Sequence, residues 1–308
     1  MRALLYDPEA PQRLRLGEAP EPLPGASQAL VEVHAVSFNF GELAYREGSA
    51  QPGDIAGWDA AGVVVRAAAD GSGPAVGTRV TTFGWAGGWA ELRAVDTAEL
   101  AAVPDSVDLG AASALPVAGV TALQALRRLG PVVGRRVLVT GASGGVGRFA
   151  VQLAHRAGAQ VVASVGSPER GEGLAELGAD EIVVGLDKVS APVFGVLDNV
   201  GGAQLAEAFA LVEPGGSVQA IGKASGEATT IDFEQERHRG GGRRLEVFVV
   251  GFPLGADIAY LVDLLDRKEL DPQVGWRGSW EHAPEAAAAL LGRRVRGKAV
   301  LDVVANAQ

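Results

Sequence analysis

The apolar positions along this chain follow two different patterns. Before residue 115 they form short runs that alternate with polar residues and are separated by glycine and proline. Alternation with a period of two is typical of half-buried strands, so this part of the chain predicts a compact, mainly β domain. The strands expected there are Leu30 to Val36, Gly62 to Ala67, Arg79 to Phe83 and Trp89 to Val95.

From about Val117 to Arg267, apolar strand patterns alternate with helical ones. The six strands expected there are Val137 to Gly141, Gln160 to Val165, Glu181 to Val184, Val193 to Asp198, Gly215 to Gly222 and Leu245 to Val250. Six such strands with helices between them predict an α/β fold with a doubly wound parallel sheet. The pattern also predicts a helix from Ala256 to Arg267 and a strand from Ala299 to Val303 that rejoins the first domain. The predicted domains are residues 1–116 with 268–308, and residues 117–267.

A glycine cluster lies between the first of these six strands and a helical pattern from Val146 to Ala157. Such a loop suits a dinucleotide pyrophosphate, because glycines allow a tight turn, a close approach of backbone N–H groups and close packing of helix on strand. The helix N-terminus adds unpaired N–H donors and partial positive charge. The alternative is an ordinary strand-to-helix turn without a ligand. The candidate loop residues are Ser143, Gly144, Gly145, Val146 and Gly147.

The segment after the next strand indicates which dinucleotide is preferred. NAD-dependent enzymes place Asp or Glu about 20 residues beyond the glycines, where it accepts hydrogen bonds from the ribose. Here that position is Ser164, followed by Ser167 and Arg170, while Glu169 lies beyond the strand end. Two hydroxyls and a guanidinium suit a 2′-phosphate, so the sequence predicts NADPH. In the alternative interpretation, Ser167 caps the next helix and Arg170 is a solvated side chain.

The composition excludes several classes of function. The 308 residues contain no cysteine and only four histidines, none at metal-ligand spacing, which argues against disulfides, thiolate chemistry and a zinc site. A formal net charge of −10 argues against a nucleic-acid surface. No apolar run reaches membrane-spanning length and the first residues lack a signal-peptide pattern, so we expect a cytoplasmic protein.

The last strand expected in the sheet, Leu245 to Gly251, is strongly apolar but would lie at the sheet edge. Exposed apolar edges pair readily with another copy of the same chain. The sequence therefore predicts a homodimer joined edge to edge across a two-fold axis.

Several segments together resemble the medium-chain dehydrogenase/reductase superfamily, in particular its zinc-free quinone oxidoreductase and enoyl reductase branch. Besides the glycine loop, they are residues 57–64, 87–91, 103–105, 111–122, 197–202, 214–216 and 297–301. The resemblance covers nearly the whole chain. It implies a Rossmann domain inserted into a mainly β, GroES-like catalytic domain, with Asn199 and Gly222 among the cofactor-binding residues. Trp58 stands where zinc-dependent relatives carry a histidine ligand.

The resemblance implies hydride transfer from NADPH to a quinone or to the β carbon of an α,β-unsaturated carbonyl. Such a reaction needs hydrogen-bond donors for the charge that develops on the substrate oxygen. By position, Asn39 and Thr121 match an asparagine and a threonine near the nicotinamide, although each could instead form a turn or start a helix. Trp58 either walls the substrate pocket or is plain core. Tyr45 is one residue out of register with the family's tyrosine, which leaves water as an alternative proton donor.

Two other kinds of protein are alternatives to this interpretation. Short-chain dehydrogenases require a tyrosine followed four residues later by lysine, and none of the three tyrosines of this chain has that partner. The remaining alternative is a dinucleotide-binding sensor or structural protein without turnover, which a steady-state assay would reveal.

Overall fold

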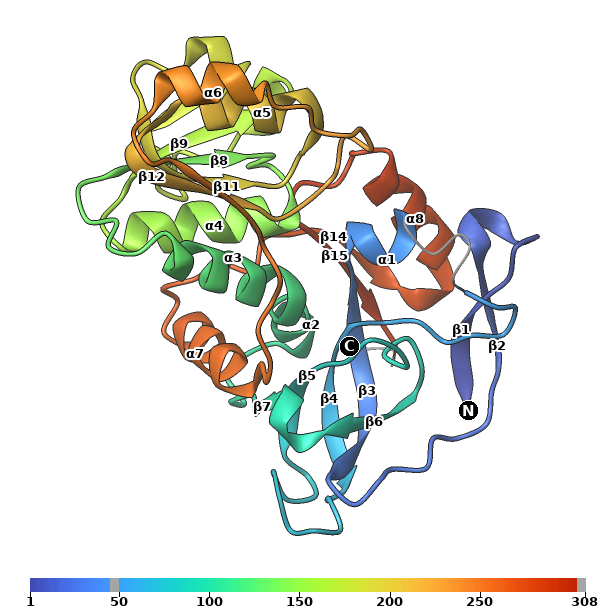
Figure 1. Ribbon diagram of the computed structural model, residues 1–308. Coiled ribbons are helices and arrows are strands. Elements are labelled where there is room, and N and C mark those ends of the chain that lie inside the picture. The colour runs from blue at the N-terminus through green and yellow to red at the C-terminus, as the bar shows by residue number, and fades with distance from the viewer. Residues whose placement is uncertain (45–49, 304–308) are drawn as a thin grey trace. The chain divides into compact units, whose positions relative to one another are not determined.

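The computed structural model describes residues 1–44 and 50–303. The chain folds into two compact units, and the first is discontinuous. Unit 1 contains residues 1–120 and 252–308, whereas unit 2 contains residues 121–251. In Figure 1 the two segments of unit 1 carry the blue-to-green and the orange-to-red ends of the colour scale.

Unit 1 is built on a seven-stranded, mostly antiparallel sheet of order β14-β15-β3-β4-β5-β7, with β6 paired to β3. Its strands are β3 (Gln28–Phe38), β4 (Asp59–Arg66), β5 (Arg79–Phe83), β6 (Leu92–Asp96), β7 (Leu100–Ala102), β14 (Val274–Ser279) and β15 (Lys298–Asp302). A hairpin of β1 (Arg2–Tyr6) and β2 (Leu14–Glu18) forms a separate two-stranded sheet. Burial alternates only over residues 31–35 of β3, and most of the strand is buried on both faces. The strands of unit 1 confirm the mainly β character predicted from the sequence.

The C-terminal strand β15 completes the sheet of unit 1 by pairing with β3. Ala299 lies opposite Phe38 in this antiparallel register, and Ser37 lies opposite Asp59 on the other side of β3. The helices of the unit are α1 (Phe40–Ala44), α2 (Leu109–Ser113), α7 (Gly255–Asp266) and α8 (Ala283–Leu291). Helix α3 (Pro116–Arg128) begins in unit 1, and its later residues belong to unit 2.

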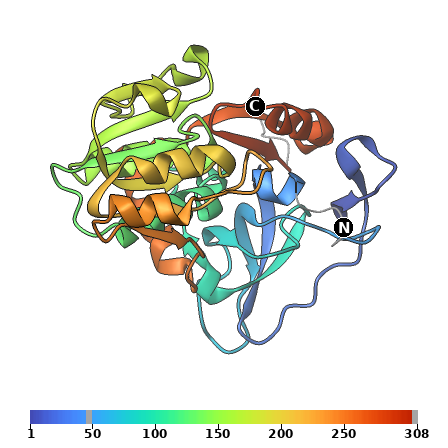
Figure 2. The same cartoon turned by 45° about the horizontal axis from the view of Figure 1, so that its top comes forward.

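Unit 2 contains a six-stranded parallel sheet of order β10-β9-β8-β11-β12-β13. Its elements are β8 (Arg136–Thr140), α4 (Gly145–Arg156), β9 (Gln160–Val165), β10 (Glu181–Val184), β11 (Val193–Asp198), α5 (Gly202–Ala210), β12 (Val212–Ala220), α6 (Phe233–Arg239) and β13 (Arg244–Val247). Figures 1 and 2 show α4 on one face of this sheet and α5 on the other. The predicted doubly wound sheet is confirmed.

The strand order reverses at β8, because the chain runs outward through β9 and β10 on one side and through β11, β12 and β13 on the other. Doubly wound folds bind their ligands outside the carboxyl ends of the strands at such a switch point. A ligand site is therefore expected at the carboxyl ends of β8 and β11.

Several boundaries in the structure differ from those predicted from the sequence. The units divide at residues 120/121 and 251/252, whereas the predicted domain boundaries were 116/117 and 267/268. The later junction differs because α7 packs on β7 of unit 1. Gly255 at the start of α7 lies so close to the backbone of Ala98 that a Cβ atom on it would stand 2.6 Å from Ala98 O. The predicted edge strand does lie at the sheet edge, but it ends at Val247. Among the residues described, no helix is both long and apolar enough to cross a membrane.

Candidate functional site

The glycine loop joins the carboxyl end of β8 to the start of α4. Gly141 has φ +59°, a left-handed conformation that favours glycine, and Gly144 is the N-cap residue of α4. A Cβ atom on Gly147 would overlap Gly141 O and stand 2.7 Å from Ala142 Cα. Only glycine at position 147 thus allows the helix to approach the strand this closely, which is the packing role expected of the third glycine.

The first turn of α4 presents backbone donors at the carboxyl end of β8. The N–H of Arg148 bonds to Gly144 O, whereas the first N–H groups of a helix have no partner within the helix itself. Gly144, Gly145 and Val146 are each half-buried, so their backbone remains accessible. With the N-terminal dipole of a helix of 12 residues behind them, these groups fit a pyrophosphate.

The carboxyl end of β11 is tied to that of β8 by buried hydrogen bonds. Asp198 accepts from Thr140 Oγ1 at 2.6 Å and from the N–H of Gly201 at 2.8 Å, and burial raises the pKa of this carboxyl. Asn199 donates its backbone N–H to Thr140 Oγ1 and its Nδ2 to Thr140 O, which fixes its side chain beside the loop. Gly222 packs against Asn199, with only 2.6 Å between its ideal Cβ position and Asn199 O.

The three residues expected to bind a 2′-phosphate differ in burial and in their hydrogen-bond partners. Ser164 is fully buried and its Oγ accepts a hydrogen bond from Gln204, and its contact with a 2′-phosphate stays a prediction. Arg170 is half-buried and its Nε donates to Ser143 Oγ at 3.0 Å, which links it to the glycine loop. Ser167 is half-buried, and its side chain bonds to Glu169 and lowers the pKa of that exposed carboxyl.

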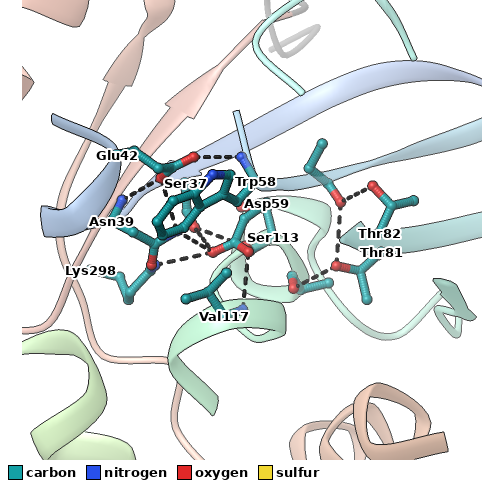
Figure 3. A network of polar contacts seen from close by, with 12 residues as sticks. Ser37, Asn39, Glu42, Trp58, Asp59, Thr81, Thr82, Ser113, Val117 and Lys298 are labelled. Atoms are coloured by element: carbon teal, nitrogen blue, oxygen red, sulfur yellow. Dashed lines mark hydrogen bonds and ion pairs between the residues drawn. The ribbon is translucent and has the colours of Figure 1, made fainter. Parts of the chain in front are cut away.

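Unit 1 contains a buried polar network made by four residues from distant parts of the chain. Figure 3 shows Asn39, Glu42, Asp59 and Lys298 pointing toward one another. They meet because β15 pairs with β3, which brings Lys298 to Asn39, and because β4 pairs with β3, which places Asp59 beside Ser37. All four are at most 9% exposed.

The Asn39 amide is fully engaged in this network. Its Nδ2 donates to Glu42 Oε2 and to Asp59 Oδ2, both at 2.9 Å, and its Oδ1 accepts from Lys298 Nζ at 2.6 Å. That Asn39 orients the nicotinamide stays a prediction. In the structure both of its amide hydrogens are donated to carboxylates, and Asn39 organises the network.

Glu42 connects the start of α1 to the start of β4. Its carboxylate accepts from the backbone N–H groups of Asn39 and Trp58. Burial, with a smaller contribution from the charge of Asp59, raises the pKa of Glu42 to about 7, against the opposing effects of the Trp58 N–H, Lys298 and Asn39. A carboxyl that is about half ionised near pH 7 thus holds the backbone of Trp58.

Asp59 joins the network to a helix. Its Oδ1 accepts from the N–H of Val117 in the first turn of α3 at 3.0 Å, and its Oδ2 lies 3.3 Å from Lys298 Nζ. Ser37 Oγ stands 3.0 Å from the same Oδ2 and 2.9 Å from Ser113 O. Buried charges persist when they are paired and hydrogen-bonded, and Asp59 meets both conditions.

Trp58 is half-buried directly before Asp59, and its indole packs edge-on against Trp85 with ring centroids 5.4 Å apart. Thr121 is the first residue of unit 2 and is 9% exposed, on α3. Tyr45 lies outside the described residues. The sequence reasoning missed Glu42, Asp59 and Lys298; the available signal was that Asp59 and Lys298 directly precede apolar strand runs, where an unpaired charge would be costly.

Comparison with known proteins adds family information to this geometry. Residues 25–105 match the model of the alcohol dehydrogenase GroES-like domain, and residues 145–267 match that of the zinc-binding dehydrogenases. The chain is 27% identical to the quinone oxidoreductase of Pseudomonas aeruginosa over 90% of this chain and 92% of that protein. It is 35% identical to the acrylyl-CoA reductase AcuI of Ruegeria pomeroyi, over 58% of this chain and 60% of the relative.

The chain spans only a small part of some relatives, such as 4% of the polyketide synthase GfsB of Streptomyces halstedii, to which it is 34% identical over 203 residues. Among solved structures, a mycobacterial protein determined with NADPH superposes with a TM-score of 0.87 at 25% identity, covering 98% of this chain and all of the other.

The residues of this chain do not fit the zinc that one family model is named for. The sequence has no cysteine, and within residues 1–44 and 50–303 no group of three or more His, Asp or Glu side chains could hold a metal ion. The glycine loop, in contrast, fits a dinucleotide, because Gly147 lets α4 pack closely on the loop, where a Cβ atom would overlap Gly141 O, and the first turn of α4 presents backbone N–H groups.

Proposed function

Because this chain belongs to the medium-chain dehydrogenase/reductase superfamily, in its quinone oxidoreductase and enoyl reductase branch, we propose that it is an NADPH-dependent reductase that works without zinc. Its acceptor is a quinone or the β carbon of an α,β-unsaturated carbonyl. The observation that carries this proposal is the glycine loop at the switch point of the sheet, closed by Gly147 and opening into the N-terminus of α4.

NADPH would supply the hydride, and the residues of unit 2 would hold the nucleotide. The first turn of α4 binds the pyrophosphate through backbone N–H groups. Arg170, whose Nε donates to Ser143 Oγ beside the loop, is the proposed 2′-phosphate contact. Asn199, fixed to the end of β8, shapes the cofactor groove beside the loop. Ser167 shares its neighbourhood with Glu169, so the guanidinium is the principal 2′-phosphate contact.

In unit 1, Trp58 stands where zinc-dependent relatives carry a metal ligand, and its proposed role is to contact the acceptor. The network centred on Asn39 and Asp59 holds the backbone of Trp58 through Glu42. The Thr121 hydroxyl is the candidate donor to the substrate oxygen, and water supplies the proton that completes the reduction.

A steady-state assay tests this function. NADPH oxidation is followed at 340 nm with quinones, enones and enoyl thioesters, and NADPH binding is measured separately by nucleotide fluorescence. Turnover of at least one acceptor class with NADPH supports the proposal. Tight NADPH binding without turnover on any of them would instead show a nucleotide-binding sensor or structural protein.

The exposed sheet edge also supports an assembly. Strand β13 pairs with β12 on one side only, and Val247 and Val249 are 77% and 66% exposed. Edge-to-edge pairing of two copies through this strand would cover both valines, and the proposed active form is a homodimer.

A further inference from the structure

A buried guanidinium in unit 1 bonds to the backbone beside two tryptophans, Trp58 and Trp85. Arg93 on β6 is 2% exposed, and its Nη1 donates to Trp58 O and to Thr82 Oγ1, both at 2.9 Å. Three longer contacts, each at 3.4 Å, reach the carbonyls of Gly57, Thr82 and Ala86. Arg93 therefore ties the segment that contains Trp58 to the segment that flanks Trp85.

The chain around Arg93 leaves room for its guanidinium. The N–H of Gly84 donates to Trp58 O at 3.0 Å, so the two segments also pair through their backbones. A Cβ atom on Gly84 would overlap Arg93 Nη2, and one on Gly88 would stand 3.3 Å from Arg93 Nη1. The lack of side chains at positions 84 and 88 thus makes the space that the guanidinium fills.

Arg93 stays charged in this buried place. Burial lowers its pKa to about 10, and the negative charges of Asp59 and Glu42 oppose that shift. The oxygens that Arg93 bonds are uncharged carbonyls and a hydroxyl. Hydrogen bonds from an ionised donor are roughly twice as strong as those between neutral groups, so the cation is a firm tie between the two segments.

The Trp58 backbone is held at its N–H and at its carbonyl by two buried ionisable side chains. Glu42 accepts from the N–H, as Figure 3 shows, and Arg93 donates to the carbonyl. The rings of Trp58 and Trp85 pack edge to face, with 5.4 Å between their centroids. A guanidinium carries five N–H donors on a rigid fork and bonds both segments at once, which the compact ammonium of a lysine cannot do.

We propose that Arg93 is a positioning residue of the reductase, whose guanidinium fixes Trp58 against residues 82–86 and thereby sets the affinity for the acceptor. The inference rests on the proposed function, in which Trp58 contacts the acceptor. A side chain that is fixed before binding loses less entropy when a ligand packs on it. Arg93 is buried and acts through Trp58, so it exchanges neither a proton nor a hydride.

The substitution Arg93→Lys tests this role, because it keeps the positive charge and removes the fork. The intact variant and the wild type are compared at saturating NADPH with 1,4-naphthoquinone, 2-cyclohexen-1-one and acryloyl-CoA as acceptors. We expect KM for the acceptor to rise by about 3- to 10-fold, the loss of one aromatic contact, while kcat and the affinity for NADPH stay nearly unchanged. If only the charge mattered, lysine would replace Arg93 without loss.

A second measurement follows the two indoles without turnover. The protein is labelled with 5-fluorotryptophan, and the fluorine NMR resonances of Trp58 and Trp85 are assigned from variants in which each is replaced by Phe. In Arg93→Lys these two resonances should shift or broaden. Those of Trp276 on β14 and Trp280 directly after it should stay in place, since neither segment is bonded by Arg93.

Two further variants control the comparison. Arg79 on β5 is another arginine of unit 1 that donates to backbone carbonyls, those of Pro104 and Val107, and Arg79→Lys should change neither KM nor the two resonances. Thr82→Val removes one acceptor of the Arg93 guanidinium and should act in the same direction as Arg93→Lys, but less strongly. It decides the question if thermal melting shows that Arg93→Lys does not fold.

Three results would overturn the inference. They are a Trp58 resonance that does not move in Arg93→Lys, equal movement of the Trp276 and Trp280 resonances, and an unchanged KM in a variant whose Trp58 resonance has moved. Failure of the proposed function is a separate outcome, in which the wild type oxidises NADPH with no acceptor. The role of Arg93 in acceptor affinity then falls with it, while the fluorine resonances still decide whether Arg93 fixes Trp58.

Discussion

Replacing Glu42 by Gln should change how the stability of unit 1 depends on pH. Glu42 is completely buried, and burial together with the nearby charge of Asp59 raises its pKa from 4.5 to about 7. The substitution keeps the size of the side chain but removes its titration. Because the amide cannot accept on both oxygen positions, the variant also loses one backbone contact, and that loss is the same at every pH.

The expected magnitude follows from the two pKa values of Glu42. Below pH 4.5 the group is protonated in both the folded and the unfolded protein, and ionisation costs nothing. Between pH 4.5 and 7 it ionises only in the unfolded state, so stability falls as the pH rises. Each unit by which the folded-state pKa of Glu42 exceeds its unfolded-state pKa costs about 1.4 kcal/mol of folding free energy. Above pH 7, ionisation of Glu42 therefore lowers the stability of unit 1 by about 3 kcal/mol.

The assay is tryptophan fluorescence, which reports the unfolding of unit 1. All five tryptophans, at positions 58, 85, 89, 276 and 280, belong to unit 1, so their fluorescence during urea unfolding reports that unit. The free energy of unfolding of the wild type minus that of Glu42→Gln should fall by about 3 kcal/mol from pH 4.5 to pH 8. Glu207→Gln, an exposed position on α5, serves as the control and should give a flat difference. A flat or rising difference for Glu42→Gln would refute the conclusion that burial dominates at this carboxyl.

Further predictions concern the other parts of the molecule. Lys298→Met should destabilise unit 1 by about 3–5 kcal/mol in urea unfolding, because Asp59 loses its buried ammonium, and adding Asp59→Asn should recover part of the loss; a change below 1 kcal/mol would contradict the pairing. Gly147→Ala should abolish NADPH binding in a fluorescence titration, since its Cβ has no space, and unchanged affinity would rule out the assigned loop. Arg170→Ala should weaken NADPH about 10-fold or more and leave NADH nearly unchanged; equal losses would mean a structural role. Val247→Lys should turn a dimer into a monomer in light scattering at micromolar concentration, and a monomeric wild type would disprove the assembly.

The sequence predicted those features that depend on local patterns. The six strands of unit 2 and the turn into α4 follow from runs of neighbouring residues, and the structure has both. The direction of Ser164 could not be predicted in this way, because a strand of a parallel sheet is buried on both faces and alternation no longer distinguishes them.

The polar network of unit 1 could not be predicted from the sequence, for a different reason. Lys298 and Asn39 are 259 residues apart, and only the register of β15 on β3 brings them together. Likewise, the assignment of α7 to unit 1 depends on its packing against β7 rather than on its own helical pattern. Long-range pairing of this kind leaves no local trace beyond a charged residue beside an apolar strand.

The discontinuity of unit 1 has a consequence for the order in which the protein can fold during synthesis. Unit 2 is one continuous stretch, residues 121–251, and all of it leaves the ribosome before strands β14 and β15 do. Until β15 arrives, the carboxylates of Asp59 and Glu42 have no Lys298 to neutralise them, and β3 lacks one of its partners. Domains generally fold as units as they emerge. Here residues 1–120 must wait for β15, while the nucleotide-binding unit between them can already be complete.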